Sequence, residues 1–341
     1  MSISEISNTF AQNFEKKVEM KKILGIGNAL CDVLTQIDDS VLKELGLPKG
    51  STQFVDFEGY KKLNEKLEKL QTSFATGGSV GNTMLALANL GAKPEFIGKV
   101  GDDRYGEFYK DNFLQHGGIP HFLIGDLPTG VCSAFITPDG QRTFDDYLGA
   151  AATLTADDLQ TEWFDNADIF YIEGYLVQNH EMVMRAADIA KSKGLKIGLD
   201  FGSYNIVEDD LPFFEQLLQK VDIIFANEDE ARSFTGKSDP VEALNVLAEK
   251  CEIAIVKIGA EGSLVKRGEE VARAAAEKVH KVVDTTGAGD YFAAGFLYGL
   301  SRGESLETCL QKGAFLASKV IQVVGTTLPD EVWDEICEKL K

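Results

Sequence analysis

The segment "DTTGAGD" (residues 284–290) is followed directly by the apolar run "YFAAGFLYGL" (291–300). Gly287, Ala288 and Gly289 carry almost no side chain, so their amides are left uncovered where the following helix begins. The first amides of a helix have no intrahelical partner, and the helix dipole adds positive potential at that end. Both effects favour an anion, in particular a phosphoryl group on which charge develops. The segment therefore predicts an anion-binding site at the start of a buried helix.

Asp290 lies in the same turn, with its carboxylate beside the predicted anion site. A carboxylate in this position can accept a proton from an attacking hydroxyl. The alternative is that Asp290 only caps a helix that packs through its small residues. Capping accounts for one aspartate but leaves the G-A-G run unexplained, so we favour the catalytic interpretation.

Short apolar runs alternate with helical patterns along most of the chain. The runs that predict strands are 22–27, 94–100, 167–174, 195–200, 221–227 and 253–259. Strands without strict polar alternation, separated by helices, are typical of a parallel sheet covered on both faces. We therefore predict an α/β core over residues 20–341 with a mostly parallel sheet flanked by helices.

Two segments, around 33–56 and 127–150, break this rhythm. The stretch "TGVCSAFITPDGQRTFDDYLGA" (129–150) predicts two alternating strands around a turn at "PDG", and "STQFVD" (51–56) is a further candidate strand. These pieces predict a small β lid attached to the core. Ligands favour clefts at such junctions.

Composition and charge exclude several classes of protein. The formal net charge of −20 makes nucleic acid and anionic membranes poor partners. The five cysteines form no C-x-x-C pair, which is typical of reduced thiols in a cytoplasmic protein rather than of a disulfide framework or zinc site. No apolar run approaches the ~20 residues of a membrane span. Residues 1–19 are polar, carry no motif and are predicted to be a dispensable extension ahead of Met20.

Two glycine motifs resemble nucleotide-binding loops, but each lacks a required glycine and has the wrong neighbouring structure. "GIGNAL" (25–30) lacks the third glycine of the dinucleotide fingerprint and continues as extended chain. "GKS" (236–238) lacks the first glycine of a P-loop and follows a helical pattern, so it is interpreted as a helix end.

Three further polar turns each allow two interpretations. "GGSVGN" (77–82), together with Asp32, can bind a polyol or simply begin a helix. In "NEDEA" (227–231), Asn227 and Glu230 share a helical face and can point at a hydrated Mg²⁺, or form a solvated acidic helix start. "KIGAEG" (257–262) is either a nucleotide contact or a plain turn.

In order and spacing, these motifs resemble those of the ribokinase-like (PfkB) carbohydrate and nucleoside kinases, over nearly the whole chain from about Lys21. "DTTGAGD" before a small-residue helix is similar to that family's C-terminal signature, and "GGSVGN…LANLGA" is similar to its N-terminal signature. "NEDE" is similar to its N-x-x-E motif and "KIGAEG" to its nucleotide turn. On these motifs the chain is identified as a member with the ribokinase-like α/β fold.

The resemblance implies a phosphotransferase that moves the γ-phosphoryl of ATP to a primary alcohol. It implies Asp290 as the catalytic base, the amides of Gly287, Ala288 and Gly289 as the anion hole, and Arg142 of the lid near the transferring phosphate. The other implied sites are the acceptor site (Asn28, Asp32, Gly77, Gly78, Asn82), the ATP site (Asn227, Lys257, Gly259, Gly262), Glu230 for Mg²⁺ through water, and Asp284 with Thr286 for the monovalent cation, here K⁺, that some members bind. The expected partners are a small acceptor and ATP, bound by a cytoplasmic monomer or homodimer.

The acceptor is predicted from finer likeness within the family. Asn28 and Asp32 are four residues apart, as in adenosine kinases, and the stretch around Arg142 resembles their lid. Tyr175 and Phe201 follow strands and either stack on a purine or belong to the core. We therefore predict phosphorylation of the ribose 5′-hydroxyl of adenosine. The alternatives are a ribokinase, fructokinase or 2-keto-3-deoxygluconate kinase of the same family, and a non-catalytic nucleoside sensor, which would need neither base nor anion hole.

Overall fold

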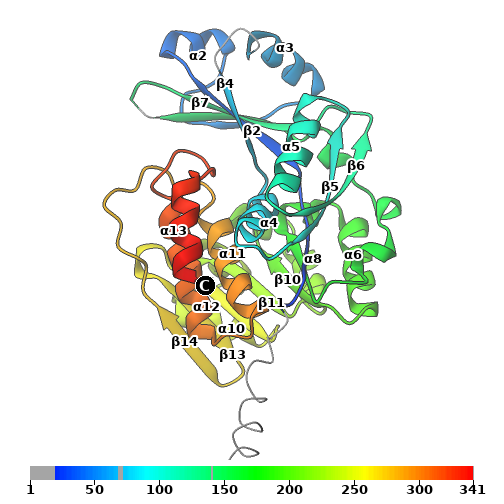
Figure 1. The fold of residues 1–341 in the computed structure, drawn as a ribbon, viewed down its shortest axis with the longest axis vertical. Helices are drawn as coiled ribbons and strands as arrows, with labels where there is room; N and C mark the ends of the chain where they lie inside the picture. The colour runs from blue at the N-terminus through cyan, green and yellow to red at the C-terminus, as the bar shows by residue number, and fades with distance from the viewer. Residues whose placement is uncertain (1–19, 68–71, 140, 341) are drawn as a thin grey trace, which may run out of the picture.

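The structure, a computed structural model, describes residues 20–67, 72–139 and 141–340. In these residues the chain forms an α/β core with a smaller β unit on top, which confirms the predicted fold class (Figure 1). The predicted extension, residues 1–19, lies outside the described residues.

The large sheet forms the centre of the core. In the described part of the chain it has nine strands, in the spatial order β14 (Glu270–Ala274), β13 (Ser263–Arg267), β12 (Ile253–Lys257), β11 (Ile223–Asn227), β10 (Lys196–Asp200), β9 (Ile169–Glu173), β1 (Ile23–Ile26), β5 (Glu95–Gly101) and β6 (Ile119–Gly125). The strands from β12 to β6 pair in parallel. β13 and β14 join antiparallel at one edge.

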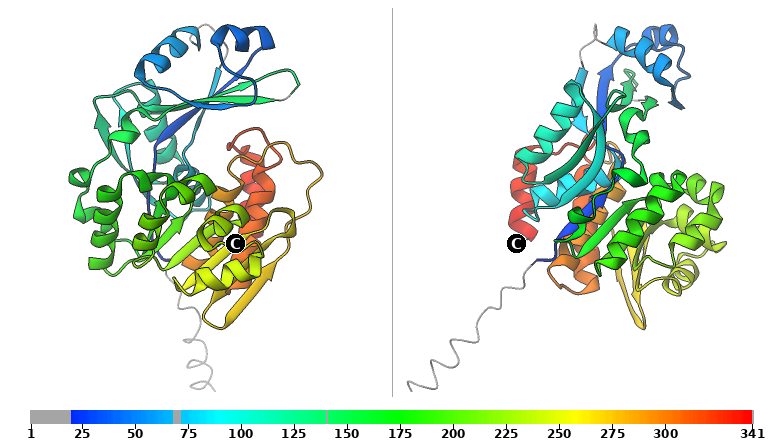
Figure 2. Two further views of the ribbon diagram at one scale, coloured as in Figure 1. Left: turned by 180° about the vertical axis from the view of Figure 1, so that it is seen from behind. Right: turned by 90° about the vertical axis from the view of Figure 1, so that its right-hand side faces the viewer.

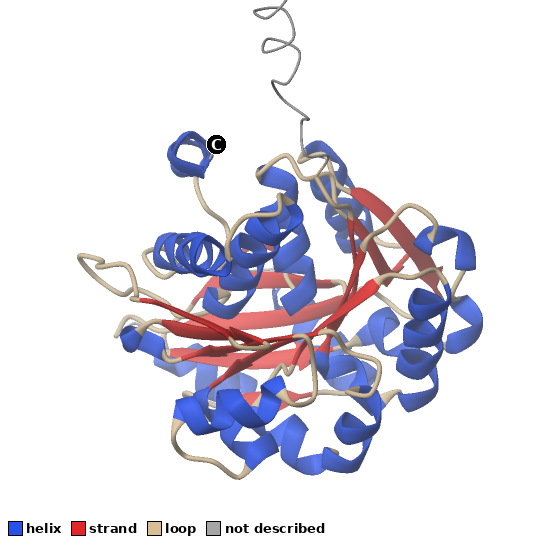
Figure 3. Cartoon of the chain, turned by 90° about the horizontal axis from the view of Figure 1, so that it is seen from below, coloured by secondary structure: helices blue, strands red, loops and turns tan. Residues whose placement is uncertain are grey.

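Side chains of the core strands alternate between two apolar layers. In β11, Ile223 and Phe225 join one buried cluster, whereas Ile224 and Ala226 join the other. Helices cover both layers, which explains why the strands read as continuous apolar runs (Figure 3). One layer contains α4 (Ser79–Asn89), α5 (Arg104–Gln115), α11 (Ala288–Ser301), α12 (Leu306–Val320) and α13 (Asp330–Leu340); the other contains α6 (His180–Ser192), α7 (Tyr204–Asp209), α8 (Leu211–Leu217), α9 (Glu228–Thr235) and α10 (Pro240–Ala248).

The smaller sheet is called the lid sheet below. Its order is β3 (Thr52–Phe54), β8 (Arg142–Tyr147), β7 (Gly130–Ile136), β2 (Leu30–Gln36) and β4 (Thr72–Thr76). Helices α2 (Asp39–Leu45) and α3 (Phe57–Leu67) cover its outer face, where Leu42, Leu63 and Phe135 form a small core (Figure 1). The inner face, which these helices do not cover, faces the α/β core (Figure 2).

Four strands of the described residues lie outside the predicted runs: β4, β6, β13 and β14. Each lies at a sheet edge or one strand from it. β6 contains Pro120, and β13 and β14 carry charged residues such as Lys266 and Arg273. Edge strands tolerate proline and charge because one side of their backbone is unpaired, so their sequences lack the apolar signal of the central strands.

The two rejected glycine motifs have structural roles. The chain after "GIGN" continues into strand β2 rather than a helix, as predicted. Gly236 ends α9 with a left-handed backbone, φ 70°, and its amide donates to the Arg232 carbonyl.

No helix in the described residues is long and apolar enough to cross a bilayer.

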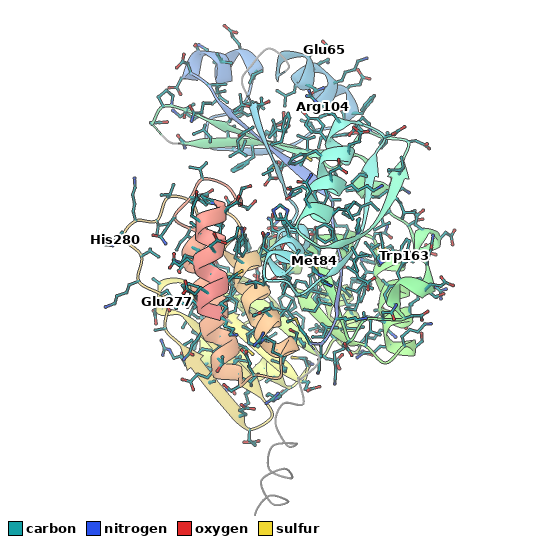
Figure 4. The ribbon with its side chains drawn as sticks, in the orientation of Figure 1. Glu65, Met84, Arg104, Trp163, Glu277 and His280 are labelled. Atoms are coloured by element: carbon teal, nitrogen blue, oxygen red, sulfur yellow. The ribbon has the colours of Figure 1, made fainter. Side chains whose placement is uncertain are left out.

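Two helices begin beneath the lid sheet and hold the site in place. α4 packs so closely on β1 that a Cβ at Gly25 would lie 2.8 Å from Met84 Cγ. Met84 is labelled in Figure 4, where it lies on α4 below the lid. α4 also contacts α11, where the Thr83 hydroxyl donates to the Asp290 carbonyl at 3.1 Å. The N-terminal turns of both helices therefore meet in front of the carboxyl ends of the central strands, where open α/β sheets bind ligands.

Candidate functional site

A cavity of about 430 Å³ lies between the lid sheet and the carboxyl ends of β10, β11 and β12. Its size is typical of a small-molecule site. The predicted site residues that line it are Asp32, Gly78, Asn82, Tyr175, Asn227, Glu230, Lys257, Thr286, Gly287, Gly289 and Asp290. The fold thus brings together motifs that are spread over most of the chain.

Asp290 lies in the first turn of α11, between two donors from α4. The Ser79 hydroxyl donates to Oδ1 at 2.7 Å, and the Asn82 amide donates to Oδ2 at 2.8 Å. Burial raises the pKa of Asp290 to about 6, although the hydrogen bonds from Asn82 and Ser79 act in the opposite direction. The result is an oriented carboxylate that is ionised at neutral pH. Its pKa is close to the pH at which a general base is efficient.

At the start of α11, fewer residues of the predicted anion site reach the cavity than the sequence indicates. Gly287 and Gly289 line the cavity, whereas Ala288 does not, and the Ala288 amide donates to the Thr285 carbonyl at 3.2 Å. Gly287 and Gly289 therefore reach the cavity, whereas the amide of Ala288 is bonded within the turn.

Asp284 closes the loop that precedes this turn and does not line the cavity. Its Oδ1 accepts from the Thr286 amide and hydroxyl at 3.1 and 2.8 Å, and its Oδ2 accepts from the Gly325 amide at 2.7 Å. The buried carboxylate therefore ties the 284–286 turn to the loop after α12.

Lys257 brings a positive charge to the anion site. Its Nζ lies 3.4 Å from Oδ2 of Asp200, and a Cβ at Gly289 would lie 3.1 Å from that Nζ. Burial lowers the pKa of Lys257, but Asp200 and Glu230 outweigh this and raise it above its ordinary value. A charged ammonium is thus held beside the start of α11, in a site where carboxylates predominate.

Asn227 and Glu230 form a reciprocal cap at the start of α9. The Asn227 side chain accepts from the Glu230 amide at 2.9 Å, and Glu230 Oε2 accepts from the Asn227 amide at 2.8 Å. The Asn227 side-chain amide also donates to Glu230 Oε1 at 2.7 Å. Glu230 is buried, and burial raises its pKa. The pair therefore begins the helix, but as a buried cap that lines the cavity and not as a solvated acidic start.

The carboxylates of Glu230 and Asp200 suit a magnesium ion that keeps most of its water ligands. No three His, Cys, Asp or Glu side chains in the described part of the chain are arranged to enclose a metal. Mg²⁺ with a nucleotide usually takes one or two protein carboxylates, with phosphates and water as the remaining ligands. Glu230 and Asp200 line the cavity and fit that role.

Asp32, in β2 of the lid sheet, lies against the glycine turn before α4. A Cβ at Gly77 would lie 2.2 Å from Asp32 Oδ1, so only glycine allows this approach. Burial, then the charges of Asp146 and Asp290, raise the pKa of Asp32 to about 7. Gly77 therefore acts by making room for Asp32 and does not itself line the cavity.

Asn28 lies outside the cavity lining and is held by a buried carboxylate. Its side-chain amide donates to Glu173 Oε1 at 2.6 Å, and the Val80 amide donates to Glu173 Oε2 at 3.0 Å. Glu173 thus joins β1, β9 and the start of α4. This bond holds the Asn28 side chain beside Glu173, and its contact with the acceptor stays a prediction.

The inner face of the lid sheet presents two rows of side chains, set by the strand register. Asp32, Cys132 and Asp146 are paired across β2, β7 and β8 and form a polar row. Leu34, Ala134 and Phe144 are paired in the same way one step further out and form an apolar row. All six side chains line the cavity. The lid therefore offers one polar and one apolar strip to a bound molecule.

The two candidate aromatic residues differ in burial and in position. Phe201 is fully buried and packs against Phe214 and Phe234, so it belongs to the core. Tyr175, in the 3₁₀ turn Gly174–Gln178, is 41% exposed and lines the cavity, and its hydroxyl donates to the Gly202 carbonyl at 3.0 Å. Only Tyr175 is placed to contact a ligand.

Besides Ala288, Asp284, Asn28 and Gly77, three further predicted residues are not among those that line the cavity. Gly259 begins the 3₁₀ turn Gly259–Glu261 and faces open space, and Gly262 ends it where a Cβ would lie 2.0 Å from the Ala274 carbonyl. Close backbone packing thus accounts for Gly262. Arg142 begins β8, and its side chain lies outside what the structure describes.

The sequence motifs miss three polar residues on the core side of the site, Ser79, Glu173 and Asp200, and every member of the two lid rows except Asp32. Glu173 and Asp200 end the apolar strands β9 and β10. A carboxylate at the carboxyl end of a buried parallel strand is itself a signal, because that edge binds ligands. Ser79 falls inside the "GGSVGN" turn, but only the fold shows that it faces Asp290.

Comparison with known proteins gives relatives of two kinds. The chain is 30% identical to the adenosine kinase of Saccharomyces cerevisiae, over 90% of this chain and 96% of the relative. It is 29% identical to a 5-dehydro-2-deoxygluconokinase of Listeria innocua, over 81% of this chain and 90% of the relative. The structure resembles that of an adenosine kinase from Sinorhizobium meliloti with a TM-score of 0.82 and 34% identity, covering 94% of this chain and 99% of that one. It resembles equally, at a TM-score of 0.82 and 33% identity, a probable sugar kinase from Rhizobium etli, covering 94% and 98%.

The sequence profile of the pfkB family carbohydrate kinases matches residues 50–333 of the chain. This match spans the turn before α4, the carboxyl ends of the central strands and the start of α11. The chain therefore belongs to the pfkB family of carbohydrate kinases.

Proposed function

We propose that this protein transfers the γ-phosphoryl group of ATP to the 5′-hydroxyl of adenosine. The observation that carries the choice of acceptor is the pair of rows on the lid sheet. A nucleoside has a polyol part and an apolar, planar part, which match the polar and apolar rows. A free sugar is polar throughout and leaves the apolar row of Leu34, Ala134 and Phe144 without a partner.

Tyr175 adds to this argument from the opposite side of the cavity. Its half-exposed ring comes from the core, while the apolar row comes from the lid. An aromatic ring on one side and aliphatic carbon on the other make a slot for a planar base. The adenosine kinases among the relatives are consistent with this choice.

The chemistry is assigned to the start of α11. Asp290, oriented by Ser79 and Asn82, accepts the proton of the acceptor hydroxyl as the bond to phosphorus forms. The amides of Gly287 and Gly289 hold the charge that develops on the phosphoryl oxygens. Lys257 neutralises part of the same charge and is kept in place by Asp200.

Bound Mg²⁺ would offset the negative charge of the nucleotide phosphates. Glu230 and Asp200 would hold its water shell, with Asn227 keeping Glu230 in position. K⁺ near Asp284 and Thr286 remains a prediction. It is tested by comparing the turnover rate in K⁺ with the rate in a large organic cation at equal ionic strength.

The test is release of ADP with ATP and Mg²⁺ and a panel of adenosine, inosine, ribose, fructose and 2-keto-3-deoxygluconate. We expect the highest kcat/KM for adenosine. A free sugar that is phosphorylated faster than every nucleoside would replace the proposal with a sugar kinase, the second kind of relative. Nucleoside binding without any ADP release would indicate a sensor.

A matched pair of variants checks that the lid selects the acceptor. Leu34→Ser places a hydroxyl in the apolar row, whereas Leu42→Ser alters the outer core of the same lid. We expect Leu34→Ser to reduce kcat/KM for adenosine more than for ribose. A loss of equal size for both acceptors would argue against a base slot.

A further inference from the structure

Asp146 lies at the end of the polar row opposite to Asp32. It pairs with Cys132 across β7 and β8, and Cys132 pairs with Asp32 across β2 and β7. Neighbouring strands are about 4.8 Å apart, so the two aspartate Cα atoms are separated by about 10 Å. Both residues line the same cavity. Two carboxylates therefore face one bound molecule from the two ends of the row.

Asp146 has hydrogen-bonding capacity that the described part of the protein leaves unused. The Cys132 thiol is hydrogen-bonded to its carboxylate, but Oδ1 is buried and has no partner among those residues. A buried oxygen without a partner costs free energy, and a donor on a bound molecule offsets that cost. Because rotation about χ2 of aspartate is soft, either carboxylate oxygen can turn toward the cavity.

The catalytic groups assigned above do not include Asp146. Asp290 and the start of α11 lie in the core, whereas Asp146 belongs to β8 of the lid. Its position on the inner face, beside the apolar row, suits a group that binds the acceptor rather than one that transfers a proton. It therefore bears on specificity.

We propose that Asp146 is a second acceptor-binding carboxylate, which together with Asp32 selects a neutral acceptor that offers hydrogen-bond donors at both ends of the polar row. In their ionised form, the same two carboxylates disfavour an acceptor with a phosphate or carboxylate group in that position, because like charges repel. This inference rests on the proposed function and specifies the kind of acceptor that the site takes.

The neighbouring residue provides a matched control. Asp145 is buried, carries an unpaired Oδ1 as Asp146 does, and follows the alternation of β8 to the opposite face of the lid sheet. It does not line the cavity. Asp145→Asn and Asp146→Asn thus make the same chemical change at adjacent positions, one away from the acceptor and one facing it.

The experiment measures KM and kcat of the wild type and both variants with adenosine, 2′-deoxyadenosine, 3′-deoxyadenosine and adenosine 3′-monophosphate. We expect Asp146→Asn to raise KM for adenosine about tenfold with little change in kcat, as for the loss of a hydrogen bond to a charged group. One of the two deoxyadenosines should then show a KM penalty in the wild type that is absent in Asp146→Asn. Adenosine 3′-monophosphate should gain at least about fivefold in kcat/KM relative to adenosine.

The inference is overturned if Asp146→Asn changes no KM more than Asp145→Asn does, or if both deoxy penalties persist in Asp146→Asn. Asp146→Ser is the second variant if Asp146→Asn shows no cooperative melting. Failure of the proposed function is seen separately, as a wild type that prefers a sugar. In that case the same comparison of the two variants, made with that sugar and its deoxy analogue, decides the role of Asp146.

Discussion

Replacing Asp290 by asparagine tests the central assignment, because the structure predicts opposite effects on turnover and on stability. In Asp290→Asn the oxygen that accepts from the Asn82 amide can be kept, and the new amide can donate to the Ser79 hydroxyl, which rotates to accept. The shape and the hydrogen-bond count of the helix start are therefore preserved. The change removes the negative charge and the proton acceptor.

The effect on turnover follows from the loss of the base. General-base assistance contributes about 10²–10⁴-fold, or roughly 3–5 kcal/mol of activation free energy. We expect kcat to fall at least about a hundredfold while the Kd of the acceptor changes less than about tenfold. The low-pH limb of the wild-type rate profile, which the Asp290 pKa of about 6 predicts, should be absent from the residual activity of the variant.

The effect on stability follows from the raised pKa. Burial lifts the pKa of Asp290 from 3.8 to about 6, so the folded state binds this proton more tightly than the unfolded state. The stabilising contribution of the group is complete below pH 3.8 and is lost as the pH rises through about 6. Above that pH the ionised carboxylate destabilises the fold by up to about 3 kcal/mol. Asp290→Asn should therefore melt about 1–3 °C higher than the wild type at pH 8 and show a smaller difference at pH 5.

Coupled ADP release and thermal melting at the two pH values measure both effects. ATP binding by the variant, measured by calorimetry, serves as the control for an intact site. Turnover near the wild-type rate would reduce Asp290 to a helix cap. A melting difference that does not depend on pH would refute the assignment of a raised pKa.

Four further predictions concern the rest of the site and the chain. Lys257→Met should raise KM for ATP and lower kcat, each about tenfold, because it removes the ammonium beside Gly289; unchanged ATP kinetics would make Lys257 a structural partner of its strand end only. Tyr175→Ala should weaken adenosine binding about tenfold with little change in melting temperature, whereas Phe201→Ala should cost about 3–5 kcal/mol of unfolding free energy; equal behaviour of the two would contradict their different burial. Arg142→Ala should lower kcat more than it raises acceptor Kd, and an unchanged kcat would place the arginine on the surface of the lid. A chain shortened to begin at Met20 should melt and turn over like the full chain, and a large loss of either would show that residues 1–19 support the fold.

The sequence by itself determines the parts of this protein that depend on neighbouring residues. The central strands can be predicted because each is a buried run of about five apolar residues, as in "IIFAN" of β11. The start of α11 can be predicted because glycine, helix and carboxylate are adjacent in "GAGD". Asn227 and Glu230 are three residues apart, so their pairing follows from helix geometry alone.

Tertiary structure alone decides which of these parts meet. Asn82 and Asp290 are 208 positions apart, and no local pattern in either segment shows that one orients the other. The side chain of Asn28 donates to the buried Glu173, 145 positions away, and this contact has no local signal either. The polar and apolar rows of the lid exist only through the register of β2, β7 and β8. Local sequence encodes backbone conformation and burial, but the partner of a side chain depends on how strands pair and helices pack, and that is a property of the whole chain.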